Sequence, residues 1–216
     1  MTLVRLRLAF LVATPLALAV VLWWHPAGGS DVYEGVRDDA GAWLFVHAAM
    51  LVLLPLLAIA AFVVFRDLGG RAALVSRIAI LFFLVFFTAY EVSVGVGTGI
   101  LVDYANSLPA AEQAVVADAI QDYNRNWIVT DPSIAMVVGA LSWIVAMIAA
   151  AIAFRRSGGG WPVTLLIGGA ALFAIHPPPL GPIGLVCFAC AAVLIERWRG
   201  HVEAGVVALL DEPLPD

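Results

Sequence analysis

The chain has 216 residues, of which 63% are hydrophobic and 12% are charged, and its mean hydropathy is +1.00. Soluble domains are about half apolar and about a quarter charged, so this composition excludes an ordinary soluble protein. The formal net charge is −5 and lysine is absent, which excludes a basic surface for nucleic acid. The sequence therefore predicts an all-α integral membrane protein whose main partner is the lipid bilayer.

Six apolar stretches are candidate membrane-spanning helices of a single transmembrane domain over residues 1–199, followed by a tail over 200–216. In chain order they cover about 8–24, 42–65, 78–102, 132–154, 161–176 and 183–195. Apolar residues at helical spacing over about 109–123 predict an amphipathic helix that lies on the membrane surface. Asp131 and Pro132 predict the start of the fourth span, as N-cap and first helical residue.

The placement of arginines predicts the orientation, because positively charged loops stay in the cytoplasm. With six spans, only Arg37 and Arg125 of the 11 arginines fall on the outer side. The sequence thus predicts a six-transmembrane-helix bundle in the plasma membrane, with both termini cytoplasmic and an extracytoplasmic amphipathic helix. Tryptophans are enriched at membrane interfaces, so we expect a group of them to mark the outer interface. These are Trp23, Trp24, Trp43 and Trp127.

The third span carries one charged side chain, Glu91, close to the middle of the membrane. Inserting a carboxyl group at the middle of the membrane costs about 3 kcal/mol, so we expect Glu91 to face the protein interior. Thr88, Gly95 and Thr98 share its helix face and complete a small, polar stripe. Gly95 and Gly99 form a small-xxx-small pair, which predicts the close approach of another helix. Glu91 can serve as a metal ligand, a proton carrier or a ligand anchor, or it can be a protonated, hydrogen-bonded structural group.

Two histidines fall at similar predicted depths. His47 lies about 8 Å below the outer end of the second span, at 1.5 Å per residue. The fifth and sixth stretches give only about 22 Å and 18 Å of helix, against a hydrocarbon core of about 30 Å. The turn that begins at His176 should therefore be recessed into a protein-lined or water-filled cavity. The sequence predicts an outward-facing polar pocket with Glu91 as its floor and the two imidazoles on its walls. The predicted rim residues are His25, Tyr90, Thr88, Thr98 and Asp103.

This residue set suggests a cofactor. Two histidines and an acid suit a zinc ion with an open coordination position, and two facing histidines suit a haem iron. We therefore predict a metal ion or haem as the cofactor, with His47, His176 and Glu91 as metal ligands. Glu91 is also the candidate catalytic group, for membrane-embedded hydrolysis or electron transfer, although no motif specifies either reaction.

Two other functions fit the same residues. One is a proton- or cation-coupled transporter in which Glu91 takes up the coupling ion, although the inner half of the chain offers no polar path. The other is a non-catalytic membrane assembly subunit, in which the polar cluster only packs. A small ligand or a membrane protein partner is compatible with either, and the sequence leaves open whether the protein is an enzyme.

Overall fold

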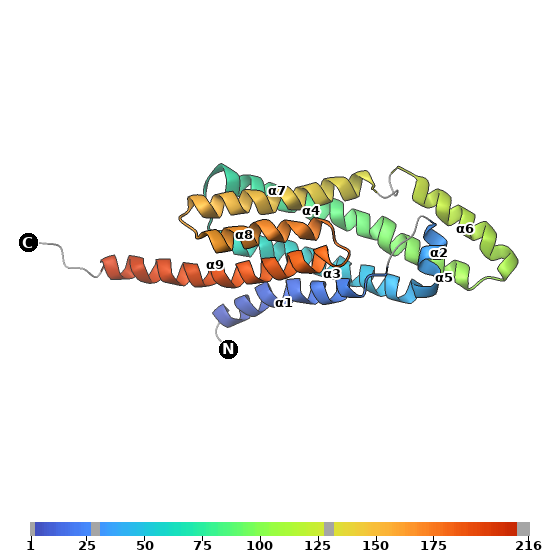
Figure 1. The fold of residues 1–216 in the computed structure, drawn as a ribbon, viewed down its shortest axis with the longest axis horizontal. Coiled ribbons are helices and arrows are strands. Elements are labelled where there is room, and N and C mark those ends of the chain that lie inside the picture. Colours follow the sequence, from blue (N-terminus) through green and yellow to red (C-terminus); the bar gives the residue numbers. More distant parts are fainter. Residues whose placement is uncertain (1–2, 27–30, 128–131, 211–216) are drawn as a thin grey trace, which may run out of the picture.

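The computed structural model describes residues 3–26, 31–127 and 132–210, with only the helical backbone over 201–210. Within these ranges the chain forms helices joined by short connections. The long helices lie side by side along the long axis of the molecule (Figure 1): α1 (Leu3–Trp23), α3 (Ala40–Phe65), α4 (Gly70–Tyr90), α7 (Ile134–Arg156) and α9 (Leu180–Leu210). The shorter ones are α2 (Val32–Val36), the 3-10 helix η1 (Arg37–Asp39), the π-helix η2 (Glu91–Gly97), α5 (Thr98–Asn106), α6 (Ala110–Arg125), α8 (Trp161–Gly169) and the 3-10 helix η3 (Ala170–Ala174).

Five helical segments of the described chain are long and apolar enough to cross a membrane. They are Leu3–Trp23, Val32–Phe65, Gly70–Asn106, Ile134–Arg156 and Leu180–Gly200. This confirms the predicted all-helical class and a chain suited to several membrane crossings. A shorter apolar helix, Trp161–Ala174, packs against α7 and α9. The sixth span stays a prediction, because this helix is shorter than a bilayer requires.

Two predicted boundaries differ from the structure. Helix α7 begins at Ile134, and the side chain of Ser133 caps it by accepting a hydrogen bond of 3.1 Å from the backbone N–H of Met136. Pro132 precedes the helix, and Asp131 lies outside the described residues. Helix α9 starts at Leu180 and continues to Leu210, so it is longer at both ends than the apolar stretch over 183–195. The charged residues that follow this apolar stretch remain in the helix, because their side chains can form ion pairs without interrupting its backbone hydrogen bonds.

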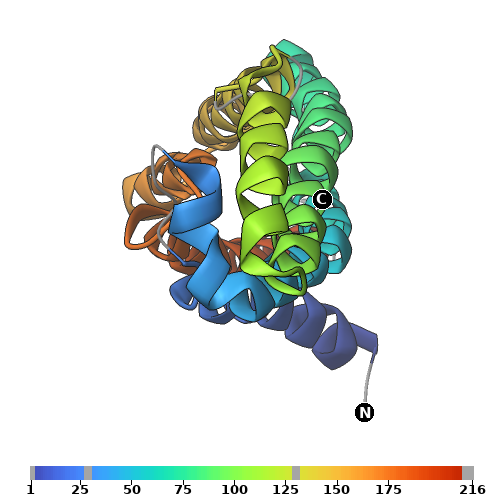
Figure 2. The same ribbon diagram turned by 90° about the vertical axis from the view of Figure 1, so that its right-hand side faces the viewer.

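Two segments are much longer than a bilayer is thick. Val32–Phe65 has 34 residues and Gly70–Asn106 has 37, which at 1.5 Å per residue correspond to about 50 Å and 55 Å. The start of the first segment and the end of the second pack together with α6, and Ile120 of α6 is buried in the same apolar cluster as Tyr33 and Trp43. Figure 2 shows α6 crossing this end of the bundle, while α1 begins and α9 ends at the opposite end (Figure 1). Part of the apolar face of α6 therefore packs on protein through Val116 and Ile120, while Val115 of the same face is 70% exposed. Contact of this helix with the membrane surface stays a prediction.

Aromatic side chains fill the middle of the bundle. Trp143 of α7 is fully buried, and its indole N–H donates a 2.8 Å hydrogen bond to the carbonyl of Ala170. Its ring lies 4.7 Å from that of Phe83 on α4, measured between centroids. The two helices are held closely together because Gly139 of α7 lies directly on the backbone of Phe87.

Charged residues join three helices at the end of the bundle where the chain begins. Arg199 of α9 is 8% exposed, and its guanidinium forms an ion pair of 2.9 Å with Asp67 and donates to the Val64 carbonyl at 2.6 Å. Glu196, on the same face of α9, pairs with Arg199 and with Arg7 of α1. We call these residues the arginine clasp. It satisfies buried charges at a position where unpaired ones would be costly.

We expect Gly139→Ala to destabilise the protein. A Cβ at this position would lie 2.8 Å from the backbone nitrogen of Phe87 and 2.9 Å from its Cα, atoms that cannot move without displacing α4. Overpacking of this kind costs about 1–3 kcal/mol, which outweighs the roughly 1 kcal/mol that alanine gains over glycine in a helix. The measurement is the melting temperature in detergent, with Gly41→Ala as the control, because a Cβ at Gly41 meets nothing within 4 Å. Equal melting temperatures for the Gly139→Ala and wild-type proteins would contradict the close packing of α4 on α7.

Candidate functional site

A π-helix, Glu91–Gly97, interrupts the long helix formed by α4 and α5. Its wider turns change the hydrogen bonding of the backbone, and side chains supply additional donors to its carbonyl groups. The Ser93 carbonyl accepts a 2.9 Å hydrogen bond from the Tyr123 hydroxyl of α6, and the Gly95 carbonyl accepts a 2.7 Å bond from the indole N–H of Trp43. Single π-helical turns occur frequently at functional sites. This turn therefore marks the part of the chain where a site is most expected.

Helix α3 packs directly on the π-helix and on the start of α5. A Cβ on Gly95 would lie 2.1 Å from Cδ2 of His47, and one on Gly99 would lie 2.7 Å from Cδ2 of Leu44. The two glycines thus create the space that α3 occupies, in agreement with the small-xxx-small pattern. Because Gly95 has no side chain, the imidazole of His47 can lie flat against the backbone one turn from Glu91.

The His47 ring and the Glu91 carboxyl group face each other in the interior. His47 is 3% exposed, and its Nδ1 lies 2.7 Å from the carbonyl of Trp43. A carbonyl only accepts, so Nδ1 carries the proton, and in the neutral ring Nε2 presents a lone pair. Nε2 lies 3.7 Å from Oε2 of Glu91. Glu91 is fully buried, and neither of its oxygens has a hydrogen-bond partner among the described residues.

His25 brings a third imidazole into this group. Its ring centroid lies 4.9 Å from that of His47 and 5.2 Å from that of His176. Nδ1 of His25 donates to the carbonyl of Pro26 at 2.7 Å, and its Nε2 is buried without a partner in the described structure. Burial lowers the pKa of His25 below its ordinary value, so the ring is neutral at neutral pH. The sequence placed His25 at the rim, whereas the structure places it in contact with both other rings.

His176 lies in the turn between η3 and α9 and is 5% exposed. Its ring packs edge-on against Phe87 of α4 at 5.6 Å and against Tyr90 at 6.2 Å. Since His47 and His176 are each about 5 Å from His25, their ring centroids are no more than about 10 Å apart. The structure thus brings together His47, His176 and Glu91, three residues widely separated in the sequence. We call His25, His47, His176 and Glu91 the histidine–glutamate cluster.

The other predicted rim residues have different positions. Tyr90 is 6% exposed, and Thr98 is fully buried with its hydroxyl donating to the side-chain oxygen of Asn124 at 3.2 Å. Thr88 is partly buried, and its hydroxyl has no partner within the described ranges. Asp103 is exposed on α5 and forms none of the ion pairs recorded for the described residues. The side chains of the polar stripe therefore lie inside the bundle up to Thr98, whereas Asp103, further along α5, is exposed.

Trp43 is a site residue that the sequence assigned to the membrane interface. It is 8% exposed, whereas Trp23, Trp24 and Trp127 are each more than 60% exposed. Its ring lies 4.4 Å from that of His47, so it supports the imidazole while its N–H supports the π-helix. The spacing of Trp43 and His47, four residues apart on one helix, already indicates that the two side chains are neighbours.

The cluster is not a preformed metal centre. Among the residues that the structure describes, no group of three or more His, Cys, Asp or Glu side chains is already arranged to hold a metal ion. What the cluster does show is a set of buried lone pairs on Glu91, His47 and His25. Comparison of the chain with protein-family models, with curated proteins and with solved structures found no match.

We expect Trp43→Phe to destabilise the protein by about 1–3 kcal/mol. Phenylalanine keeps most of the ring but removes the N–H, which leaves the buried Gly95 carbonyl without this donor. The matched control is Trp24→Phe, at a tryptophan that is 61% exposed. Thermal unfolding in detergent measures the difference, and equal effects of the two substitutions would show that the bond to Gly95 contributes nothing.

Proposed function

We propose that this chain is a six-span protein of the plasma membrane, with cytoplasmic termini, that binds a divalent transition-metal ion of the zinc class near its outer end. The proposed ligands are the members of the histidine–glutamate cluster: His25, His47, His176 and Glu91. The observation that carries the proposal is the fully buried carboxyl group of Glu91, which faces a lone pair of His47 and has no donor among the described residues. These atoms accept hydrogen bonds but do not donate them, and a cation bound among them would satisfy them.

The number of unpaired buried atoms favours a bound metal ion over a single bound proton. A buried polar atom without a partner costs about 1–3 kcal/mol, and an ionised carboxylate costs more. One proton between Glu91 and His47 satisfies that pair but leaves Nε2 of His25 unpaired. A metal ion engages all three side chains together. The hydrogen bonds from Nδ1 of His25 and of His47 to backbone carbonyls are also the supporting contacts that metal-bound histidines usually make.

One distance in the cluster is close to that in a metal site. Around a tetrahedral ion with bonds of about 2.0–2.1 Å, neighbouring ligand atoms lie about 3.4 Å apart. The 3.7 Å between Nε2 of His47 and Oε2 of Glu91 is longer by a few tenths of an ångström. Closing the site requires rotation of the His25 and His176 rings toward this pair. Zinc bound there would supply a Lewis acid, and Glu91 faces the remaining coordination position, where it can bind directly or hold a water molecule.

The surroundings of the cluster disfavour haem and transport. The His25 ring contacts both His47 and His176, so a macrocycle between those two rings would have to displace it. On the inner side of the cluster, Phe87 contacts His176 and belongs to the buried aromatic group that includes Trp143. A path for a proton or cation across the bundle would have to cross these apolar rings. A buried site that is closed on this side by apolar rings fits a bound ion better than a transported one.

Elemental analysis of the purified protein tests the proposal. We expect about one zinc-class ion per chain after loading with zinc and removal of the excess, and its loss in the His47→Ala, His176→Ala double variant. His201→Ala is the matched control, because it removes the fourth histidine of the chain, which lies in the C-terminal part of α9. Absence of metal from the loaded wild-type protein would overturn the proposal and favour an assembly subunit with a purely structural cluster.

The role of Glu91 is tested by Glu91→Gln, which keeps the shape of the side chain and removes its charge. We expect the zinc affinity to fall by more than the 10–100-fold that changes next to a ligand usually cause. Competition with a zinc-binding dye measures the affinity, and Glu112→Gln on the exposed face of α6 is the control. Unchanged affinity in the Glu91→Gln protein would remove this carboxyl group from the ligand set.

A further inference from the structure

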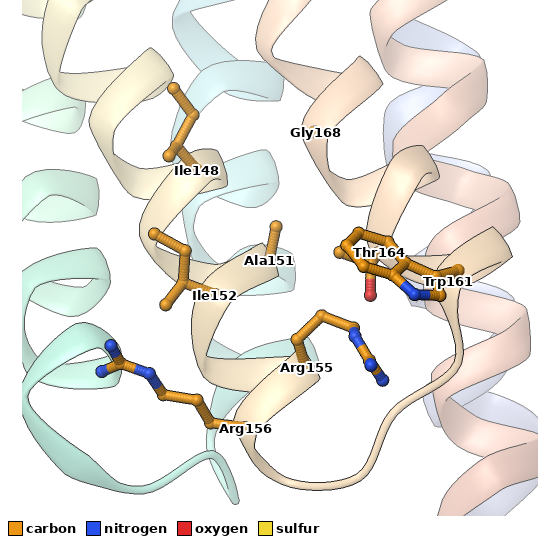
Figure 3. Close-up of a pocket in the computed structure, with 8 residues that line it drawn as sticks. All are labelled: Ile148, Ala151, Ile152, Arg155, Arg156, Trp161, Thr164 and Gly168. Carbon is orange, nitrogen blue, oxygen red and sulfur yellow. The ribbon is translucent and has the colours of Figure 1, made fainter.

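A second candidate site lies at the other end of the bundle, between α7 and α8. A cavity of about 470 Å³ is lined by the last turns of α7 and the first turns of α8 (Figure 3). Ile148 and Ile152 form its apolar wall, and both are more than 40% exposed on the outside of the helix bundle. The cavity therefore opens toward the surface that faces lipid.

Two arginines stand at the mouth of this cavity. Arg155 and Arg156 end α7, and Figure 3 shows their side chains at one end of the group, with Ile148 at the other. The Arg155 guanidinium lies 4.7 Å from the centre of the Trp161 ring and donates to the carbonyl of Gly159. These contacts position the charge without neutralising it.

The two charges lack acidic partners. None of the ion pairs within the described ranges involves Arg155 or Arg156, whereas Arg199, at the same end of the bundle, pairs with two carboxylates in the arginine clasp. A guanidinium has five N–H donors, and Arg155 uses one of them in its bond to Gly159. Both side chains are exposed, and Figure 3 shows their guanidinium groups on opposite sides of the end of α7, so one anion binds both only when Arg156 turns toward Arg155.

We propose that this cavity binds an anionic phospholipid, with the phosphate on Arg155 and Arg156 and one acyl chain along Ile148 and Ile152. The charges end the apolar segment Ile134–Arg156, so they mark the level where the hydrocarbon region meets the headgroups. The apolar wall begins directly above them and continues on the lipid-facing side. Basic pockets between membrane helices bind acidic headgroups in this way. A soluble phosphate would use the arginines but gain nothing from the apolar wall.

Native mass spectrometry of the full-length protein in detergent tests this inference. Phosphatidylglycerol, phosphatidylcholine and inorganic phosphate are titrated separately. We expect phosphatidylglycerol to bind at lower concentrations than phosphatidylcholine, and Arg156→Gln to weaken its binding about fivefold, the contribution of one basic residue near a headgroup. Arg71→Gln is the matched control, because Arg71 is exposed at the same end of the bundle, at the start of α4.

A second substitution separates the lipid from free phosphate. Ile152→Asn places a polar group on the proposed acyl-chain wall and should weaken phosphatidylglycerol while leaving any phosphate adduct unchanged. Three results would overturn the proposal: equal binding of the two lipids, equal effects of Arg156→Gln and Arg71→Gln, or phosphate binding that matches phosphatidylglycerol in affinity and in its response to both variants. Melting temperatures of the variants confirm that any loss occurs in folded protein.

Discussion

A fully buried carboxyl group without a donor among the described residues is the constraint around which the half of the bundle next to α6 is built. Glu91 cannot face lipid without a large cost, so its helix must be covered on that side. Helix α3 supplies the cover, and it can approach only because Gly95 and Gly99 have no side chains. The same approach brings His47 to within 3.7 Å of the carboxyl group. Packing and site geometry are thus consequences of one requirement.

Buried charged groups have different partners at the two ends of the bundle. In the arginine clasp, Arg199 has two carboxylates and a backbone carbonyl as partners, so its charge is compensated within the protein. In the histidine–glutamate cluster, the facing atoms of Glu91 and His25 have no such compensation from the described residues. The Nε atoms of Arg7 and Arg199 also lack a hydrogen-bond partner, but each guanidinium is paired with a carboxylate, whereas Glu91 faces no cation among the described residues. This contrast supports the proposal that the histidine–glutamate cluster binds a cation.

Much of this arrangement could be predicted from the sequence, because the bilayer imposes strong rules on length and polarity. The apolar stretches predicted the long helices, and the isolated polarity of Glu91, His47 and His176 predicted that these residues belong together. The start of α7 could not be placed as well, because Asp131 and Ser133 are both good caps and only the backbone path selects Ser133. His25 follows α1, and no helical period fixes the position of a residue outside a helix.

The π-helix was also beyond sequence reasoning, because 3.6-residue periodicity assumes regular hydrogen bonding throughout. It has a consequence for how this protein can change during evolution. Each residue of an α-helix turns the chain by about 100°, so a π-turn behaves as a one-residue insertion that the helix absorbs locally. Deleting one residue between Glu91 and Gly97 would therefore restore a continuous α-helix while α4 and α5 keep their phase, and only the side chains of the interval itself would shift. A gain or loss of one residue here would fall on the short segment that carries Glu91 and leave the packing of the rest of the helix in place.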